Sequence, residues 1–127
     1  MTQSGKEVAM KFQILLFALS QILKIASFTN SKFKRYISKA SARVLIKTTD
    51  GQYGRLFVFD KGNFSSMAGD QKNFDVALVW KDADTGFSVM TNKSPDASFN
   101  AAAEGKLRVE GMSVYAQWFE GAIKLVM

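Results

Sequence analysis

The chain has 127 residues, of which 47% are hydrophobic and 22% charged, and its formal net charge at pH 7 is +6. This length fits one domain with a core of its own. The absence of cysteine and histidine excludes thiol nucleophiles, Ser-His or Cys-His relays and zinc sites built on those ligands. No recognisable pair of carboxylates is set up for acid/base chemistry either, so we expect a noncatalytic protein with no cofactor and no metal site.

Residues 12–28 predict a long helix with a wide apolar face. The apolar residues at helical spacing are Phe12, Leu15, Leu16, Leu19, Ile22, Leu23 and Ala26, and a thin polar line is formed by Gln13, Ser20, Lys24 and Ser27. This pattern predicts a core helix that is covered on most sides. Polar residues interrupt it too often for a transmembrane span. A cleaved signal peptide is the alternative, but the apolar run is short and lacks a clean cleavage site.

The positive charge is concentrated near the N-terminus. Residues 1–50 hold nine basic and two acidic residues, a net +7, whereas the remainder holds eight against nine, a net −1. A second helix is expected from Ser31, as its cap, to about Lys39. The basic residues around it are Lys32, Lys34, Arg35, Lys39 and Arg43. They suit contact with an anionic membrane or nucleic acid, and a solvated helix face is the simpler interpretation.

Four strand signals follow. Residues 44–48 and 53–60 flank an Asp50-Gly51 turn, and a second turn at 60–63 leads into a weaker strand at 64–67, which predicts an antiparallel meander. The strongest strand is expected at 75–80, with Val76, Leu78 and Trp80 on one face and smaller residues on the other. Apolar character on both faces indicates a central position in the sheet.

The last third of the chain predicts two short helices, a strand and a final helix. Asp82 and Asp84 suit the start of the first helix, and the second stops at Gly105. Residues 105–111 alternate strictly, with Leu107 and Val109 on one face. Residues 113–126 form an amphipathic pattern with a wide apolar face.

The order of motifs from Asp75 to Gly111 resembles the sterol carrier protein type 2 family, also called nonspecific lipid-transfer proteins. The matching features are Asp75 at a strand start, the acidic turn at 82–84, a short helix, a helix with Phe99, and Gly-Lys-Leu-x-Val-x-Gly at 105–111. The resemblance extends more weakly over 40–127. We therefore expect a 1–39 apolar and basic helical segment and a 40–127 sterol-carrier-like lipid-binding domain within one compact unit.

The resemblance implies an α+β fold with a five-stranded, mostly antiparallel sheet and helices over one face. It also implies an apolar tunnel for sterols, fatty acids, acyl-CoA or phospholipids. The surplus of 11 Phe and 6 Met suits such a lining. Candidate ligand-binding residues are Phe57, Phe59, Leu78, Trp80, Phe87, Met90, Phe99, Met112, Tyr115, Trp118 and Phe119. Simple core packing is the alternative for each of them.

These observations predict noncatalytic binding or transfer of an apolar lipid by a cytoplasmic protein whose basic helices contact anionic membrane peripherally. The alternative is a noncatalytic scaffold or accessory protein in a lipid or quinone biosynthetic assembly. That alternative predicts a filled core and a stable oligomer, a homodimer in the simplest case. Nucleic-acid binding ranks third, because the basic residues lack a recognisable reading motif.

Overall fold

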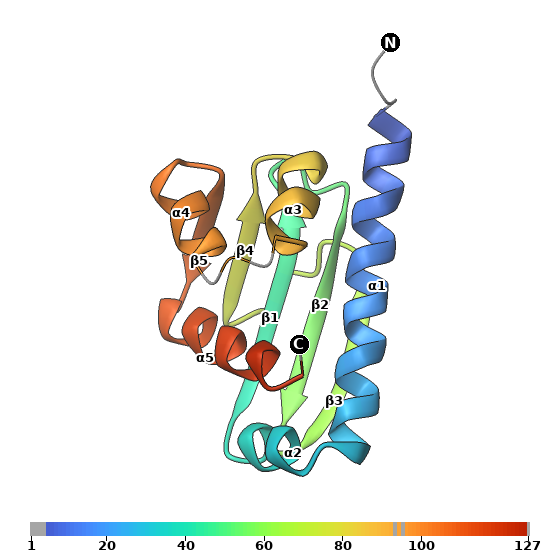
Figure 1. The fold of residues 1–127 in the computed structure, drawn as a ribbon, viewed down its shortest axis with the longest axis vertical. Coiled ribbons are helices and arrows are strands. Elements are labelled where there is room, and N and C mark those ends of the chain that lie inside the picture. The colour runs from blue at the N-terminus through green and yellow to red at the C-terminus, as the bar shows by residue number, and fades with distance from the viewer. Residues whose placement is uncertain (1–4, 93, 95, 127) are drawn as a thin grey trace.

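The computed structural model describes residues 5–92, 94 and 96–126, and within them a mixed sheet runs in the order β3-β2-β1-β4-β5 (Figure 1). Its strands are β1 Ser41–Thr48, β2 Gly54–Asp60, β3 Asn63–Ala68, β4 Val76–Trp80 and β5 Leu107–Gly111. The first three strands form the predicted antiparallel meander. Strand β4 then pairs with β1 in parallel, and β5 pairs with β4 in antiparallel. The expected α+β class with a five-stranded sheet is confirmed.

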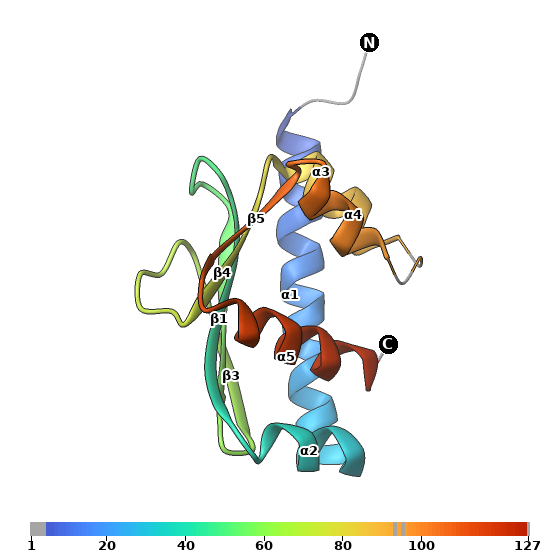
Figure 2. The ribbon, with the colours of Figure 1, turned by 90° about the vertical axis from the view of Figure 1, so that its left-hand side faces the viewer.

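The helices gather on one face of this sheet, as Figure 2 shows edge-on. They are α1 Gly5–Thr29, α2 Ser31–Ile37, α3 Ala83–Met90, α4 Ala97–Ala103 and α5 Ser113–Lys124. Helix α1 runs along the sheet beside β3, whereas α5 crosses the strands and α2 lies at one end (Figure 1). Among the described residues, the opposite face carries only loops (Figure 2).

Side-chain caps fix where two of these helices begin. The carboxylate of Asp82 accepts a hydrogen bond of 2.8 Å from the Thr85 amide, as predicted. At α2 the cap is Asn30, whose side chain accepts from the Phe33 amide at 3.0 Å. The prediction of Ser31 as the cap was wrong by one position. Asn and Ser are nearly equal as caps, so two such neighbours cannot be ranked from sequence.

The strands divide their side chains between two apolar clusters. Val76 and Trp80 join the main core beneath the helices, with Leu78 partly buried against it. The second cluster, on the other face, contains Leu45, Leu56, Ala77 and Val79, with Val58 and Phe74 packed against it. Because alternate residues of β4 belong to different clusters, the predicted alternation along this strand is confirmed. The connection from β3 to β4 folds over the face of the second cluster, where Arg43 Nε donates to the Asn73 carbonyl at 2.6 Å.

Helix α1 differs from its prediction in which sides it buries. Its inner face is fully buried through Phe12, Leu16 and Leu23, but the opposite face is open to solvent, so the expectation of a helix covered on most sides was wrong. Ser20 and Ser27 also lie on the buried side, at 1% and 4% exposure. Their hydroxyls donate to the Phe17 and Lys24 carbonyls, each at 2.6 Å. These bonds within the helix supply each hydroxyl with an acceptor, so both side chains can be buried without a hydrogen bond to water.

By length and composition alone, α1 would be able to cross a membrane. The segment Glu7–Thr29 has a mean hydropathy of 1.6, and a third of it is buried inside the protein. Here it serves as the core helix that the apolar spacing predicted, with one side against the sheet and α3.

Candidate functional site

The structure separates the predicted ligand-binding residues into three environments. Phe57, Phe59, Trp80 and Phe119 are buried in the main core. Leu78, Met90, Tyr115 and Trp118 are partly buried against this core, and Phe87 on α3 is partly exposed. Phe99 and Met112 lie on the surface, at 76% and 56% exposure. The structure therefore brings together the residues from β2, β4 and α5, and leaves Phe99 and Met112 outside that group.

Aromatic rings fill the layer between β2 and α5. Phe59 lies 5.0 Å from Phe64 and 6.0 Å from Phe119, measured between ring centroids. Phe57 lies 5.7 Å from Phe119. Tilted and edge-on rings at these distances are close-packed. This part of the interior, where the resemblance implies a tunnel, is occupied by side chains.

Trp80 leaves one polar atom of the core unpaired. Its indole Nε1 is buried and has no hydrogen-bond partner among the described residues. A buried donor without a partner costs about 1–3 kcal/mol. The interior therefore has a site that would favour a hydrogen-bond acceptor.

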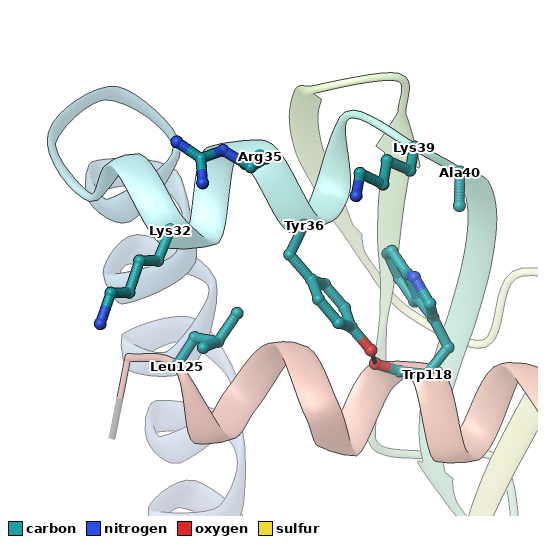
Figure 3. A pocket seen from close by; sticks show the side chains of 7 residues that line it. All are labelled: Lys32, Arg35, Tyr36, Lys39, Ala40, Trp118 and Leu125. Atoms are coloured by element: carbon teal, nitrogen blue, oxygen red, sulfur yellow. Dashed lines mark hydrogen bonds between the residues drawn. The ribbon is translucent and has the colours of Figure 1, made fainter.

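An open groove of about 570 Å³ lies between α2 and α5 (Figure 3). Its lining consists of Lys32, Arg35, Tyr36, Lys39, Ala40, Trp118 and Leu125. The last two come from α5 and its C-terminal end, and the others come from α2 and the turn after it. Tyr36, Ala40 and Leu125 were not among the predicted site residues. The concentration of basic residues around α2 is the signal that pointed to this half of the groove.

The floor of the groove is a stacked pair of aromatic rings. Tyr36 and Trp118 have centroids 5.4 Å apart and planes inclined by 25°. The Tyr36 hydroxyl donates a hydrogen bond of 2.8 Å to the backbone carbonyl of Trp118 (Figure 3). Gly121 permits this approach, because a Cβ atom there would collide with the hydroxyl. Burial raises the pKa of Tyr36, so the phenol keeps the proton that it donates.

A second hydrogen bond fastens the two walls at the other end of the groove. Asn30 Nδ2 donates to the Leu125 carbonyl at 3.1 Å, while the same side chain caps α2. One residue therefore sets both the start of α2 and its position against the end of α5. The groove is built by contacts between segments far apart in the chain.

The rim of the groove is cationic. Lys32, Arg35 and Lys39 are exposed around the aromatic floor, and the lining includes no acidic residue. These are three of the five residues predicted to contact membrane. Lys34 is exposed on α2 but does not line the groove, and Arg43 lies on the loop-covered face of the sheet. The arrangement suits an amphipathic anion, whose charge meets the rim while its apolar part covers the rings.

The described part of the chain offers little else for chemistry. It contains no group of three or more Asp or Glu side chains that could hold a metal ion. A smaller hollow of about 170 Å³ is lined by residues that include Asn92, Asn100 and Glu104 near α3 and α4. Its lining is mixed and carries no paired carboxylates.

No family model and no curated protein matches the sequence of this chain, but solved structures match its fold. A UbiJ-SCP2 ubiquinone synthesis protein superposes with a TM-score of 0.69 at 13% identity, over 90% of this chain and 96% of that one. Sterol carrier protein 2 from Yarrowia lipolytica, in its apo form, superposes with a TM-score of 0.57 at 17% identity, over 85% of this chain and 88% of that one.

A possible sterol carrier protein from Thermus thermophilus, TT1886, gives a TM-score of 0.55 at 16% identity, over 86% of this chain and 84% of that one. All three superpositions include most of both chains. The chain therefore has the fold of sterol carrier protein 2 domains, as the motif order from Asp75 to Gly111 indicated.

Proposed function

We propose that this protein binds an anionic amphipathic lipid without catalysis and that the groove between α2 and α5 receives the lipid's charged end. The observation that carries this proposal is the combination of three cations with a stacked aromatic floor and no acidic lining residue. Charge-assisted bonds from lysine and arginine suit a carboxylate or phosphate. Each CH₂ group buried on the floor contributes about 0.8 kcal/mol. Fatty acids, acyl-CoA and phospholipids have this chemistry, whereas sterols lack the charge.

Trp118 connects this groove to the interior. One side of its indole stacks on Tyr36, and its ring centroid lies 5.0 Å from that of buried Phe59 in an edge-on contact. A rotation of the indole would join the groove to the layer between β2 and α5. We take this as the route by which an acyl tail enters, displacing the rings that fill this layer. The same exposed cations would draw the protein to anionic membrane during uptake.

The test is native mass spectrometry of the purified protein, followed by organic extraction and titration with a fluorescent fatty acid and its methyl ester. We expect a stoichiometric lipid or saturable uptake of the acid, with the neutral ester bound several-fold more weakly. A lipid-free protein that takes up neither probe would overturn the proposal. Equal binding of both probes would remove the role of the cationic rim.

A second function, as a noncatalytic scaffold in a lipid or quinone biosynthetic assembly, is favoured by a different observation. Phe57, Phe59, Phe64 and Phe119 pack against one another and leave the interior filled. A scaffold needs such a core and no ligand. Lipid-free protein that takes up neither probe in the same experiment would favour this function.

A further inference from the structure

The outer face of α1 carries an apolar stripe that no other helix or strand of the described residues covers. Met10, Ile14, Phe17, Ile25 and Phe28 are 51–72% exposed. Together with Gln21 they are spaced by 4, 3, 4, 4 and 3 residues, which keeps them in one straight row at 3.6 residues per turn over about 27 Å. A helix that is apolar on two opposite sides is normally buried on both.

Two cations beside the stripe are held by the chain itself. Lys24 Nζ donates to the Phe64 carbonyl at 3.0 Å and lies 5.2 Å from the centroid of the Phe28 ring. The Arg55 guanidinium lies 5.4 Å from the centroid of Phe17 and donates to Ser66 Oγ at 2.9 Å. Both charges are turned toward the protein, and the row itself contains no charged residue. The surface is therefore suited to an apolar partner, in contrast to the cationic groove at α2.

We propose that this stripe is the dimerisation surface of the protein and that its occupant is α1 of a second copy. Five large apolar side chains exposed to this extent form a patch on the order of 500 Å², at the upper end of what a monomer leaves open. Two such helices laid together, with their flanking residues, approach the roughly 800 Å² per partner of a stable interface. A two-fold dimer buries the same patch on both copies, so the stripe on α1 supplies both halves of the interface.

Gln21 favours a protein partner over a bilayer. It interrupts the row between Phe17 and Ile25 and is exposed. In a bilayer its amide would enter the apolar layer with no partner, whereas a facing helix can supply hydrogen-bond donors and acceptors. This inference stands apart from the proposed lipid function, because the groove and the stripe share no residue.

The test is the mass in solution, measured by light scattering after size-exclusion chromatography over a range of concentrations. We expect twice the mass of one chain for the wild type and a monomer for the double variant Ile14→Glu and Ile25→Glu. Phe99→Glu is the control, since Phe99 is an exposed apolar residue on α4, away from the stripe, and it should remain dimeric. Circular dichroism reports whether each variant keeps its fold.

A chain without cysteine also permits disulfide trapping at single sites. Under oxidation, Gln21→Cys or Ala18→Cys should form a covalent dimer, the first if the helices run parallel and the second if they run antiparallel. Phe99→Cys should not. A wild type that is monomeric at every concentration would overturn the proposal, as would a dimer that survives the double variant. Monomeric protein that floats with liposomes only when the stripe is intact would assign the surface to lipid instead.

Discussion

The Cε1 atom of Phe12 lies 2.7 Å from the place that a Cβ atom on residue 86 would occupy. Gly86 belongs to α3, and Trp80 closes the other side of the same space, with its Cγ atom 3.0 Å away. Helices α1 and α3 therefore meet across a glycine. The close approach leaves no room for even one methyl group.

Gly86→Ala should destabilise the protein. Overpacking of this kind costs about 1–3 kcal/mol, and the better helix propensity of alanine returns up to about 1 kcal/mol, which leaves a net loss of about 1–2 kcal/mol. Urea unfolding followed by circular dichroism measures the change. Ser88→Ala, at an exposed position of the same helix, serves as the control. Unchanged or increased stability of the Gly86→Ala variant would show that α1 and α3 are not in close contact.

Asp82 should link stability to acid pH. The Thr85 amide, which donates to this carboxylate, lowers the pKa of Asp82 below its ordinary value of 3.8. A lowered folded-state pKa contributes stability above the unfolded value, and this contribution is lost as pH falls through the folded value. Asp82→Ala should cost about 1 kcal/mol at pH 7. Asp82→Asn keeps a cap acceptor but should lose this contribution to the pH dependence, which urea unfolding between pH 2 and about 6 would detect as a smaller loss of stability than in the wild type.

Tyr36→Phe removes one hydrogen bond from the groove and keeps the stacked ring. We expect a loss of about 0.5–1.5 kcal/mol in unfolding free energy. Because burial raises the folded-state pKa of Tyr36, the wild type should also lose stability as pH rises through that raised value, above the ordinary 10.0. Absorbance of the phenolate measures the titration, with Tyr36→Phe identifying the signal. Titration of this tyrosine at or below 10.0 would contradict the partial burial of its hydroxyl.

The cations of the groove should govern ligand affinity. The double variant Arg35→Gln and Lys39→Gln should weaken fatty-acid binding by about tenfold, because each partly exposed charge contributes up to about 1 kcal/mol. Lys34→Gln is the control on the same helix, as Lys34 does not line the groove. Fluorescence titration at two salt concentrations measures both effects. Equal losses in the two variants would indicate a general attraction by the basic helix.

The strands could be predicted because side chains alternate between the two faces of a sheet, so the spacing of apolar residues fixes which of them share a face. Val76 and Trp80 had to share a face, and pairing with β1 and β5 put that face under the helices. Helix α1 is different, since apolar residues lie on both of its sides and periodicity cannot tell which side is inside. Ser20 and Ser27 were assigned to the polar, solvent-facing side because their side chains are polar. In the structure they lie on the buried side, where their hydroxyls donate to carbonyls of the same helix.

The groove was less accessible to sequence reasoning than the sheet. The basic residues at 32, 35 and 39 were recognisable as part of a local cluster of positive charge, but the aromatic floor made by Tyr36 and Trp118 was not. Tyr36 reaches Trp118 across 82 positions of the chain, and Asn30 reaches Leu125 across 95. No local pattern encodes a contact over such separations. The same reasoning explains why Arg43, four positions from Lys39, was grouped with the rim although it lies on the other face of the sheet.

Because α1 is the first element of the chain, its apolar surface is exposed while the rest of the protein is being translated. It comes before every strand, yet its inner side packs against β2, β3 and α3. A ribosome therefore releases the helix with neither apolar side covered, and the inner side stays bare until α3 has emerged. Exposed apolar surface in an unfinished chain promotes aggregation. The yield of soluble protein should accordingly depend on events during translation as well as on the stability of the finished fold.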